Sequence, residues 1–300
     1  MKRVLLTGAA GFIGRRCLAP LRELGYEIHA VDRDVPDQTS ADVTWHRADL
    51  LQQPERDRVV DAVHASHLLH LAWYVEPGRY VMAPENVGWV SASLALAERF
   101  IAGGGRRMVG AGTCFEYALP ADPCLEEATP IAPATLYGAC KAATGMVWRS
   151  LAARQAVSAA WGRIFYLYGP GEAASRLVSS VIADLLAGRP ALCSGGDQRR
   201  DYLHVDDVAG ALAALLDSGT SGAVNIASGI PLAVRDVVRT IAGQLGRDDL
   251  VRRDARPTPA GESSAVTADV RRLRDEVGWS PRYDLAGGLR DAIDYWRGQR

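Results

Sequence analysis

Long apolar runs and paired cysteines are both missing from this 300-residue sequence. The N-terminal segment reaches a glycine after only three apolar residues, too few for the core of a signal peptide, and no later run approaches a membrane span. The five cysteines are odd in number and widely spaced, without a Cys-x-x-Cys pair that indicates zinc or redox chemistry. We therefore expect a cytoplasmic protein with reduced thiols, no bound metal and no membrane partner.

An excess of charge is also absent. The net charge of −1 gives no general attraction to nucleic acid or to an anionic membrane, so any recognition of phosphate must be local. Lysine is scarce, because only Lys2 and Lys141 among the 34 basic residues are lysine. The single internal lysine indicates either a chemical need for an ammonium group at position 141 or chance.

The first half of the chain alternates between two kinds of segment. Strand-like runs at 3–7, 27–31, 67–71 and 107–111, with weaker ones at 43–46 and 157–164, alternate with helical stretches at 12–24, 54–63, 85–102 and from 135 onward. This alternation predicts an α/β fold with a doubly wound parallel sheet covered by helices. The second half is less regular and contains a polar loop at 252–264 and a closing amphipathic helix at 285–296.

The first strand runs directly into a glycine-rich turn. Gly8 permits the tight turn, Gly11 lets the backbone approach a pyrophosphate, and Gly14 lets the next helix pack closely on the strand. Phe12 and Ile13 lie in the same turn, whose helix N-terminus faces the anion. This pattern predicts a Rossmann-type dinucleotide site within residues 1–165, joined by a later segment near 201–227, with residues 166–300 forming mainly a smaller C-terminal substrate lobe.

Asp32 ends the second strand, where a carboxylate accepts hydrogen bonds from the ribose hydroxyls of an adenosine. This position favours NAD as the cofactor. Arg33 follows immediately and receives a ribose 2′-phosphate if Asp32 turns aside. NADP therefore stays the alternative.

Tyr137 and Lys141 are four residues apart and lie on one face of a predicted helix. A free phenol has a pKa of about 10, and a neighbouring ammonium stabilises the phenolate that proton transfer near neutral pH requires. Thr113 follows the strand at 107–111, at the carboxyl edge of the sheet where ligands of such folds bind. We predict that Thr113, Tyr137 and Lys141 are catalytic, with Thr113 holding the reacting sugar oxygen.

The sequence resembles the extended short-chain dehydrogenase/reductase family, in particular its nucleotide-sugar epimerases, reductases and dehydratases. The resemblance covers nearly the whole chain. Besides the glycine turn and the catalytic residues, the matching motifs are Asp49-Leu50, His70-Leu71-Ala72, Tyr117, Tyr168-Gly169-Pro170, Arg200-Asp201-Tyr202, His204-Val205-Asp206-Asp207 and Gly278-Trp279 with Pro281.

The resemblance implies a nucleoside diphosphate sugar as substrate, held by the C-terminal lobe, and a homodimer formed by the helices near 85–102 and 135–153. It also implies that Asp49 and Leu50 lie along the adenine, that Leu71 and Ala72 line the cofactor, and that Lys141 bonds the nicotinamide ribose. Two arginines are implied to bind the diphosphate, Arg200 and Arg256. A solvated basic loop explains Arg256 equally well.

Two departures from the family pattern bear on the reaction. The family's 4,6-dehydratases carry Asp-Glu directly after the catalytic Ser/Thr, whereas Cys114 and Phe115 follow Thr113 here, which argues against dehydration. Tyr166 stands where an asparagine often touches phosphate, so either the grip on the diphosphate or the nucleotide itself differs from the family pattern. Trp73 follows the His-Leu-Ala motif and lies either near the sugar or in the core.

These residues favour a nucleotide-sugar 4-epimerase that uses Tyr137 as acid and base at the sugar C4. The alternative is an NADPH-dependent 4-keto-6-deoxysugar reductase, in which Tyr137 donates a proton and Arg33 holds the cofactor phosphate. A remote alternative is a dinucleotide-sensing protein without catalysis, against which the intact Thr113, Tyr137 and Lys141 argue.

Overall fold

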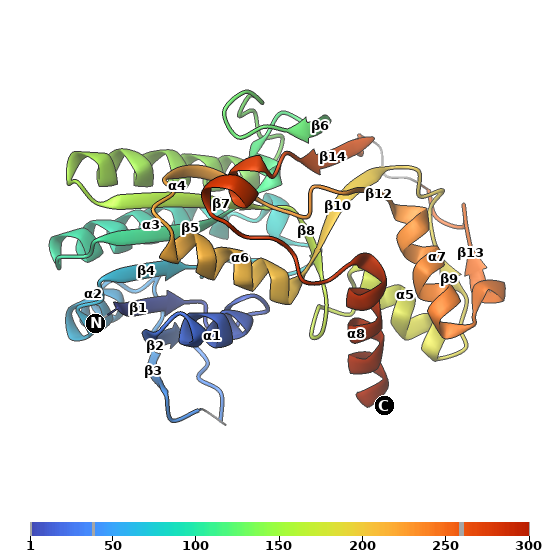
Figure 1. Cartoon of the computed structure of the whole chain (residues 1–300), viewed down its shortest axis with the longest axis horizontal. Coiled ribbons are helices and arrows are strands. Elements are labelled where there is room, and N and C mark those ends of the chain that lie inside the picture. The colour runs from blue at the N-terminus through green and yellow to red at the C-terminus, as the bar shows by residue number, and fades with distance from the viewer. Residues whose placement is uncertain (1, 38–39, 258–260, 300) are drawn as a thin grey trace.

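The computed structural model describes residues 2–37, 40–257 and 261–299, and its largest feature is a parallel sheet between two layers of helices (Figure 1). Seven strands lie in the order β11-β7-β5-β4-β1-β2-β3, and all neighbouring pairs are parallel. This confirms the predicted Rossmann-type α/β fold. The strands are β1 (Lys2–Thr7), β2 (Tyr26–Asp32), β3 (Val43–Arg47), β4 (His67–His70), β5 (Arg107–Thr113), β7 (Ser158–Ile164) and β11 (Gly222–Ile226).

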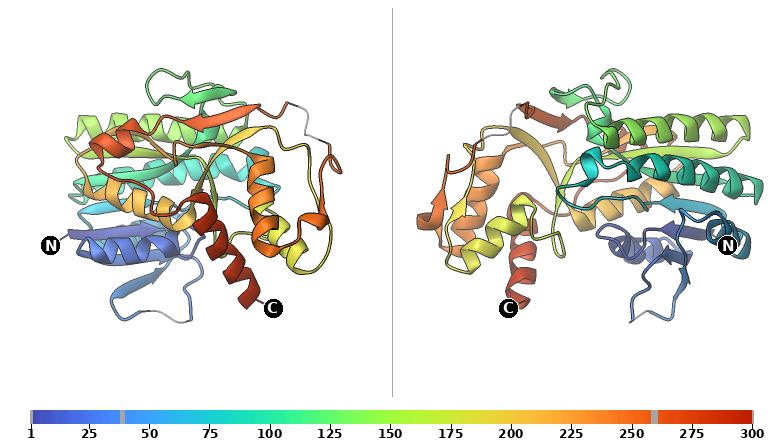
Figure 2. Two further views of the ribbon diagram at one scale, coloured as in Figure 1. Left: turned by 45° about the vertical axis from the view of Figure 1, so that its right-hand side comes forward. Right: turned by 180° about the vertical axis from the view of Figure 1, so that it is seen from behind.

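The helices divide between the two faces of this sheet (Figures 1 and 2). One apolar core joins α1 and α6 to the sheet, and a second joins α2, α3 and α4 to the opposite face. The strands between them are buried on both faces, which explains their continuous apolar runs. The helices are α1 (Gly14–Glu23), α2 (Gln53–Val63), α3 (Glu85–Ala102), α4 (Leu136–Arg154) and α6 (Val205–Asp217).

A smaller lobe stands beside the carboxyl edge of the sheet (Figure 2). Its helices α5 (Leu177–Leu186), α7 (Val234–Leu245) and α8 (Leu285–Gly298) share one apolar core, and α8 confirms the predicted closing helix. The chain also forms a second sheet in the order β12-β10-β14-β6, with β8 paired to β10. Its strands are β6 (Ala121–Cys124), β8 (Tyr166–Tyr168), β10 (Arg199–His204), β12 (Pro231–Ala233) and β14 (Ala265–Ala268).

The chain passes between the two parts several times. β6 follows β5 in sequence, yet its hydrogen-bonded partner is β14, about 140 residues further along. After the first strands of the lobe, α6 packs against α1, and β11 adds to the main sheet beside β7. The predicted loop at 252–264 begins in the short strand β13 (Val251–Arg252), which pairs with β9 (Ala191–Leu192), and residues 258–260 lie outside the described part.

No helix in the described ranges is long and apolar enough to cross a membrane.

Candidate active site

The predicted cofactor and catalytic residues gather at the carboxyl edge of the main sheet. The glycine turn follows β1, Leu71 and Ala72 follow β4, and Thr113 ends β5. These three strands are neighbours, with Thr7 opposite His70 in the register. The sheet therefore places residues more than one hundred positions apart in sequence at one site.

The glycine turn is packed so closely that side chains do not fit at two of its positions. Gly8 has a φ of +68°, and a Cβ there would lie 2.7 Å from the Ala72 nitrogen. A Cβ on Gly14 would lie 2.0 Å from the Gly8 carbonyl oxygen. Gly11 donates a hydrogen bond to that same oxygen, at 3.1 Å. The turn thus presents bare backbone and a helix N-terminus, which fits the pyrophosphate of a dinucleotide.

Asp32 is tied to this turn by hydrogen bonds. Its Oδ2 accepts from the Ala10 backbone nitrogen at 3.0 Å, and its Oδ1 accepts from the Arg33 backbone nitrogen at 2.8 Å. The carboxylate therefore faces the turn, while the Arg33 side chain is exposed. Further along this edge, Asp49 accepts from the Leu51 nitrogen at 3.0 Å beside the buried Leu50.

The residues after β4 are held by a buried polar pair. Thr7 Oγ1 lies 2.7 Å from His70 Nδ1 and accepts from the backbone nitrogens of Leu71 and Ala72 at 3.2 and 3.3 Å. Burial, with the nearby Lys141, lowers the pKa of His70 to about 3. A neutral imidazole thus fixes this segment. Phe12 and Ile13, in the glycine turn, are half-buried.

Tyr137 lies in the first turn of α4, which begins at Leu136. The helix is capped by Thr135, whose Oγ1 accepts from the Gly138 nitrogen at 3.0 Å. Burial raises the pKa of the Tyr137 phenol above its ordinary value, and the nearby Tyr80 adds to the rise. A side-chain hydrogen bond with Thr113 opposes it. The structure therefore brings the predicted phenol near the predicted hydroxyl.

Lys141 lies one helical turn further on, and its side chain is buried. Its Nζ donates to the Ala111 carbonyl oxygen at 2.8 Å and lies 3.9 Å from the centre of the Trp73 ring. Burial lowers the pKa of Lys141 to about 7, and the charge of Glu116 opposes this shift. The ammonium and the neutral amine are therefore both accessible near neutral pH.

Glu116 is a buried carboxylate that the sequence reasoning did not identify. Its Oε1 accepts from the Thr113 backbone nitrogen at 2.9 Å and from Trp161 Nε1 at 2.8 Å, and its Oε2 accepts from Arg163 Nε at 2.8 Å. Arg163 also donates to the Tyr117 hydroxyl at 2.9 Å. The Thr-x-x-Glu spacing is a capping-box pattern and is the signal that points to Glu116. Because protein groups occupy both oxygens, this carboxylate is not free for acid–base chemistry.

The predicted substrate residues lie at different distances from the predicted catalytic residues Tyr137 and Lys141. Trp73 is buried against Lys141. Arg200 is buried under the Tyr166 ring, 5.3 Å from its centre, and donates to Glu262 Oε1 at 2.7 Å. Phe115 connects Tyr166 to Tyr137, since its ring centre lies 6.4 Å from each.

Arg256 lies in a different setting. Its side chain is exposed, and its backbone nitrogen donates to the Cys193 carbonyl oxygen at 3.2 Å.

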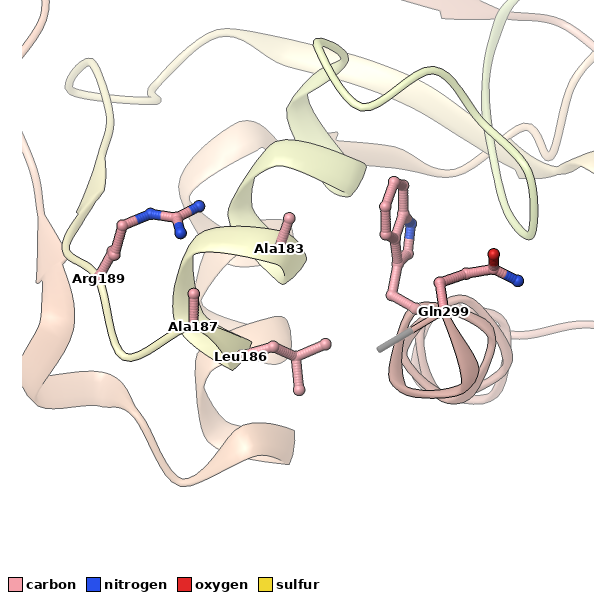
Figure 3. A pocket seen from close by; sticks show the side chains of 6 residues that line it. Ala183, Leu186, Ala187, Arg189 and Gln299 are labelled. Carbon is pink, nitrogen blue, oxygen red and sulfur yellow. The ribbon is translucent and has the colours of Figure 1, made fainter.

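Two other features lie in the lobe and contain none of the predicted site residues. His204 accepts from the Asp206 nitrogen at 3.3 Å, and its Nε2 lies 3.2 Å from Asp291 Oδ2, so the protein itself contacts both ring nitrogens. Figure 3 shows a shallow pocket between α5 and α8, lined by Ala183, Leu186, Ala187, Arg189, Trp296 and Gln299.

A Rossmann-type sheet, a glycine turn after its first strand and a Tyr–Lys pair beside a threonine define the class of extended short-chain dehydrogenases/reductases. The chain belongs to the NAD dependent epimerase/dehydratase family, whose model matches residues 4–227. NAD is thus its cofactor, and the glycine turn and Asp32 fit that group.

Relatives match over the full length of the chain. A UDP-glucose 4-epimerase of Azospirillum brasilense is 29% identical over 98% of this chain and 92% of its own. The structure of MoeE5 in complex with UDP-glucuronic acid and NAD is 32% identical, with a TM-score of 0.84 and coverage of 99% of this chain and 100% of that one. The UDP-glucose 4-epimerase of Thermus thermophilus, in complex with NAD, is 26% identical, with a TM-score of 0.87 and the same coverage.

Proposed function

We propose that this enzyme is an NAD-dependent 4-epimerase of a nucleoside diphosphate sugar. The observation that carries the proposal is the gathering of the Tyr137 phenol, the buried Lys141 and Thr113 at the end of β5, at the edge of the sheet where the glycine turn lies. The relatives named as UDP-glucose 4-epimerases support the same reaction.

In the proposed reaction, Tyr137 removes the proton of the sugar C4 hydroxyl. We assign Thr113 to hold that oxygen, and we assign the Lys141 ammonium, whose Nζ lies 6.0 Å from the centre of the Tyr137 ring, to stabilise the phenolate. Bound NAD supplies the chemistry that the side chains lack, acceptance of hydride from C4 and its return. Once the 4-keto sugar has rotated so that its other face is toward the cofactor, Tyr137 returns the proton to the C4 oxygen. The net reaction inverts C4 without net oxidation.

We assign the nucleotide to the lobe and the sugar to the aromatic residues around Tyr137. Arg200 offers a buried guanidinium for the diphosphate, which has to replace Glu262 as its partner. Tyr166, beside Arg200, provides a hydroxyl in place of the family's asparagine. Trp73 mainly packs against Lys141. We assign Arg256 to the solvated loop at 252–264.

For the cofactor we assign the pyrophosphate to the turn from Gly8 to Gly14, with Gly11, Phe12 and Ile13, and the adenosine ribose to Asp32. We assign Asp49 and Leu50 to the adenine, and Leu71 and Ala72 to the residues that would line the cofactor beside the glycine turn. The Arg33 side chain is exposed. In the alternative, an NADPH-dependent reductase, this side chain binds the 2′-phosphate of the cofactor.

The experiment is to release and identify the dinucleotide retained by the purified protein, then to titrate NADH and NADPH by nicotinamide fluorescence. Tightly held NAD, together with interconversion of the two C4 epimers, supports the proposal. An empty protein that prefers NADPH and reduces a 4-keto sugar contradicts it in favour of the reductase. Binding of NAD without turnover of any nucleotide sugar favours the sensing protein.

We further propose a homodimer that forms through α3 and α4. These helices pack against each other, and their outer surface carries three exposed apolar side chains, Val87, Met146 and Val147. Exposed apolar groups gathered on neighbouring helices are typical of a protein interface. We place the enzyme in the cytoplasm, which fits its five unpaired, buried cysteines.

A further inference from the structure

Aromatic rings surround the Lys141 ammonium. Its Nζ lies 3.9 Å from the centre of the Trp73 ring and 6.0 Å from the centres of the Tyr137 and Trp161 rings. Among the described residues, its hydrogen bond goes to the Ala111 carbonyl, which satisfies one of three donors. Burial has removed the water that otherwise hydrates the group. The indole face of Trp73 is the nearest replacement.

Trp73 is held in this orientation by its own contacts. Its Nε1 donates to Asn86 Oδ1 at 2.8 Å, and Asn86 in turn donates to the carbonyl oxygens of Tyr80 and Ala83 at 2.7 and 2.8 Å. Trp89 stacks on it with ring centres 6.2 Å apart. The ring therefore cannot turn away from Lys141 without breaking a buried hydrogen bond.

We propose that Trp73 is a positioning residue that keeps Lys141 in its charged form by presenting the face of its indole ring to the ammonium. A cation over an indole face is attracted by the ring quadrupole, most strongly where water is excluded. This role rests on the proposed function only where Lys141 assists Tyr137. The interaction itself is a property of the folded chain.

Within the described part of the chain, three other ionisable groups face Lys141, and each has a definite charge state or effect on the Lys141 ammonium. Glu116, from the turn after β5, favours the ammonium. His70, from β4, has its pKa lowered to about 3 by burial and is neutral near pH 7. Tyr137, on α4, is a neutral phenol until it ionises. Because burial brings the pKa of Lys141 to about 7, a change in the ring contact alters its charge within the working range.

The sequence offers a direct measurement, because it contains only two lysines. In a Lys2→Arg background, lysine labelled with ¹³C at Cε gives a single resonance, whose pH titration by NMR reports the pKa of Lys141. We expect Trp73→Leu to lower this pKa by about one unit, because it removes the ring face. We expect Trp73→Phe, which keeps a weaker face, to lower it by less.

The matched control is Trp89→Leu, which deletes a similar buried indole that faces Trp73 rather than Lys141. The hydrogen bond from Trp73 Nε1 to Asn86 still holds the Trp73 ring in this variant, so we expect the pKa of Lys141 to stay unchanged. An unchanged pKa in Trp73→Leu, or equal shifts in the Leu and Phe variants, overturns the proposal. If Trp73→Leu does not fold, the Trp73→Phe variant provides the test, because the pKa of Lys141 in that variant must lie below the pKa of Lys141 in the parent protein.

The activity readout separates this inference from the proposed function. As pH rises through the pKa of Lys141, the ammonium is lost, so the alkaline limb of kcat/KM against pH has to move to lower pH in the Trp73→Phe variant. Titration requires no substrate. A protein whose Lys141 pKa depends on Trp73 but which epimerises no sugar keeps the inference and rejects the proposed function.

Discussion

Tyr137 takes on the acid–base role in the proposed reaction, although burial raises the pKa of its phenol. The hydrogen bond from Thr113 and the charge of Lys141 have to offset that effect before proton transfer occurs near pH 7. The three side chains were predictable from the sequence, because a helix places residues four apart on one face and the strand ends at Thr113. Their roles stay predictions.

We expect Tyr137→Phe to lower kcat by about 10²- to 10⁴-fold, because it removes the proton that the reaction moves. Binding of NAD is expected to stay within a few-fold of the parent by fluorescence titration, since the ring remains. The control is Tyr74→Phe, which removes an exposed hydroxyl bonded to Glu76. Unchanged turnover in Tyr137→Phe contradicts the proposed mechanism.

Glu116 was not predictable from local sequence alone. The capping-box pattern indicates a helix start, but it does not reveal that the carboxylate is buried or that Arg163, 47 residues away, is its partner. Such a pair depends on the neighbouring positions of β5 and β7 in the sheet. Long-range contacts of this kind are set by topology rather than by the spacing of residues.

We expect Glu116→Gln to lower the free energy of unfolding by about 3 kcal/mol, because Arg163 keeps its buried charge without a carboxylate partner. Urea unfolding followed by circular dichroism measures the change. Asp61→Asn provides the comparison, since it removes the partner of Arg99 in an exposed ion pair and is expected to change little. Equal effects in the two variants contradict the buried role.

At the scale of elements, the turn between β1 and α1 was the most predictable part of the site. Three glycines at this spacing have few other uses directly after a strand. The second sheet was not predicted, because β10 carries Arg199, Arg200 and Asp201 in sequence and does not read as an apolar strand. Pairing with strands from distant parts of the chain stabilises it instead.

We expect Gly14→Ala to weaken NAD binding at least tenfold, because the new Cβ would displace the Gly8 carbonyl and open the turn. Isothermal titration with NAD measures the change. The matched variant is Gly243→Ala in α7, where the Cβ enters open space, and we expect it to raise stability by up to about 1 kcal/mol without altering NAD binding. Parent-like binding in Gly14→Ala would contradict the placement of the pyrophosphate.

The segment between β8 and α5 gives a prediction for pH. Burial raises the pKa of Glu172 to about 7, opposed by hydrogen bonds from Ser179 and by the charge of Arg176. The folded state therefore binds the extra proton between pH 4.5 and 7, and its stability falls as pH rises through that window. Relative to Glu172→Gln, we expect the parent to lose roughly 3 kcal/mol across it, measured by urea unfolding at each pH. A difference that does not vary with pH contradicts this assignment.

At the scale of the whole molecule, the proposed dimer makes a simple prediction. Met146→Glu places a charge among the exposed apolar side chains of α3 and α4, so we expect light scattering to give the 32.2 kDa mass of one chain instead of twice that mass. Ile230→Glu, at an equally exposed apolar position on the lobe, is expected to stay dimeric. A parent protein that is itself monomeric at working concentration contradicts the interface.

The pairing of β6 with β14 also bears on how such enzymes can be recombined. A chimera made by exchanging everything after β7 for the same region of a relative would leave β6 beside a foreign strand. It would also replace β11 in the main sheet and the helix α6 that packs against α1. Transfer of substrate preference therefore requires grafting short separate stretches while the rest of the chain is kept. We expect new specificities in this lineage to arise through substitutions and loop changes rather than through shuffling of whole domains.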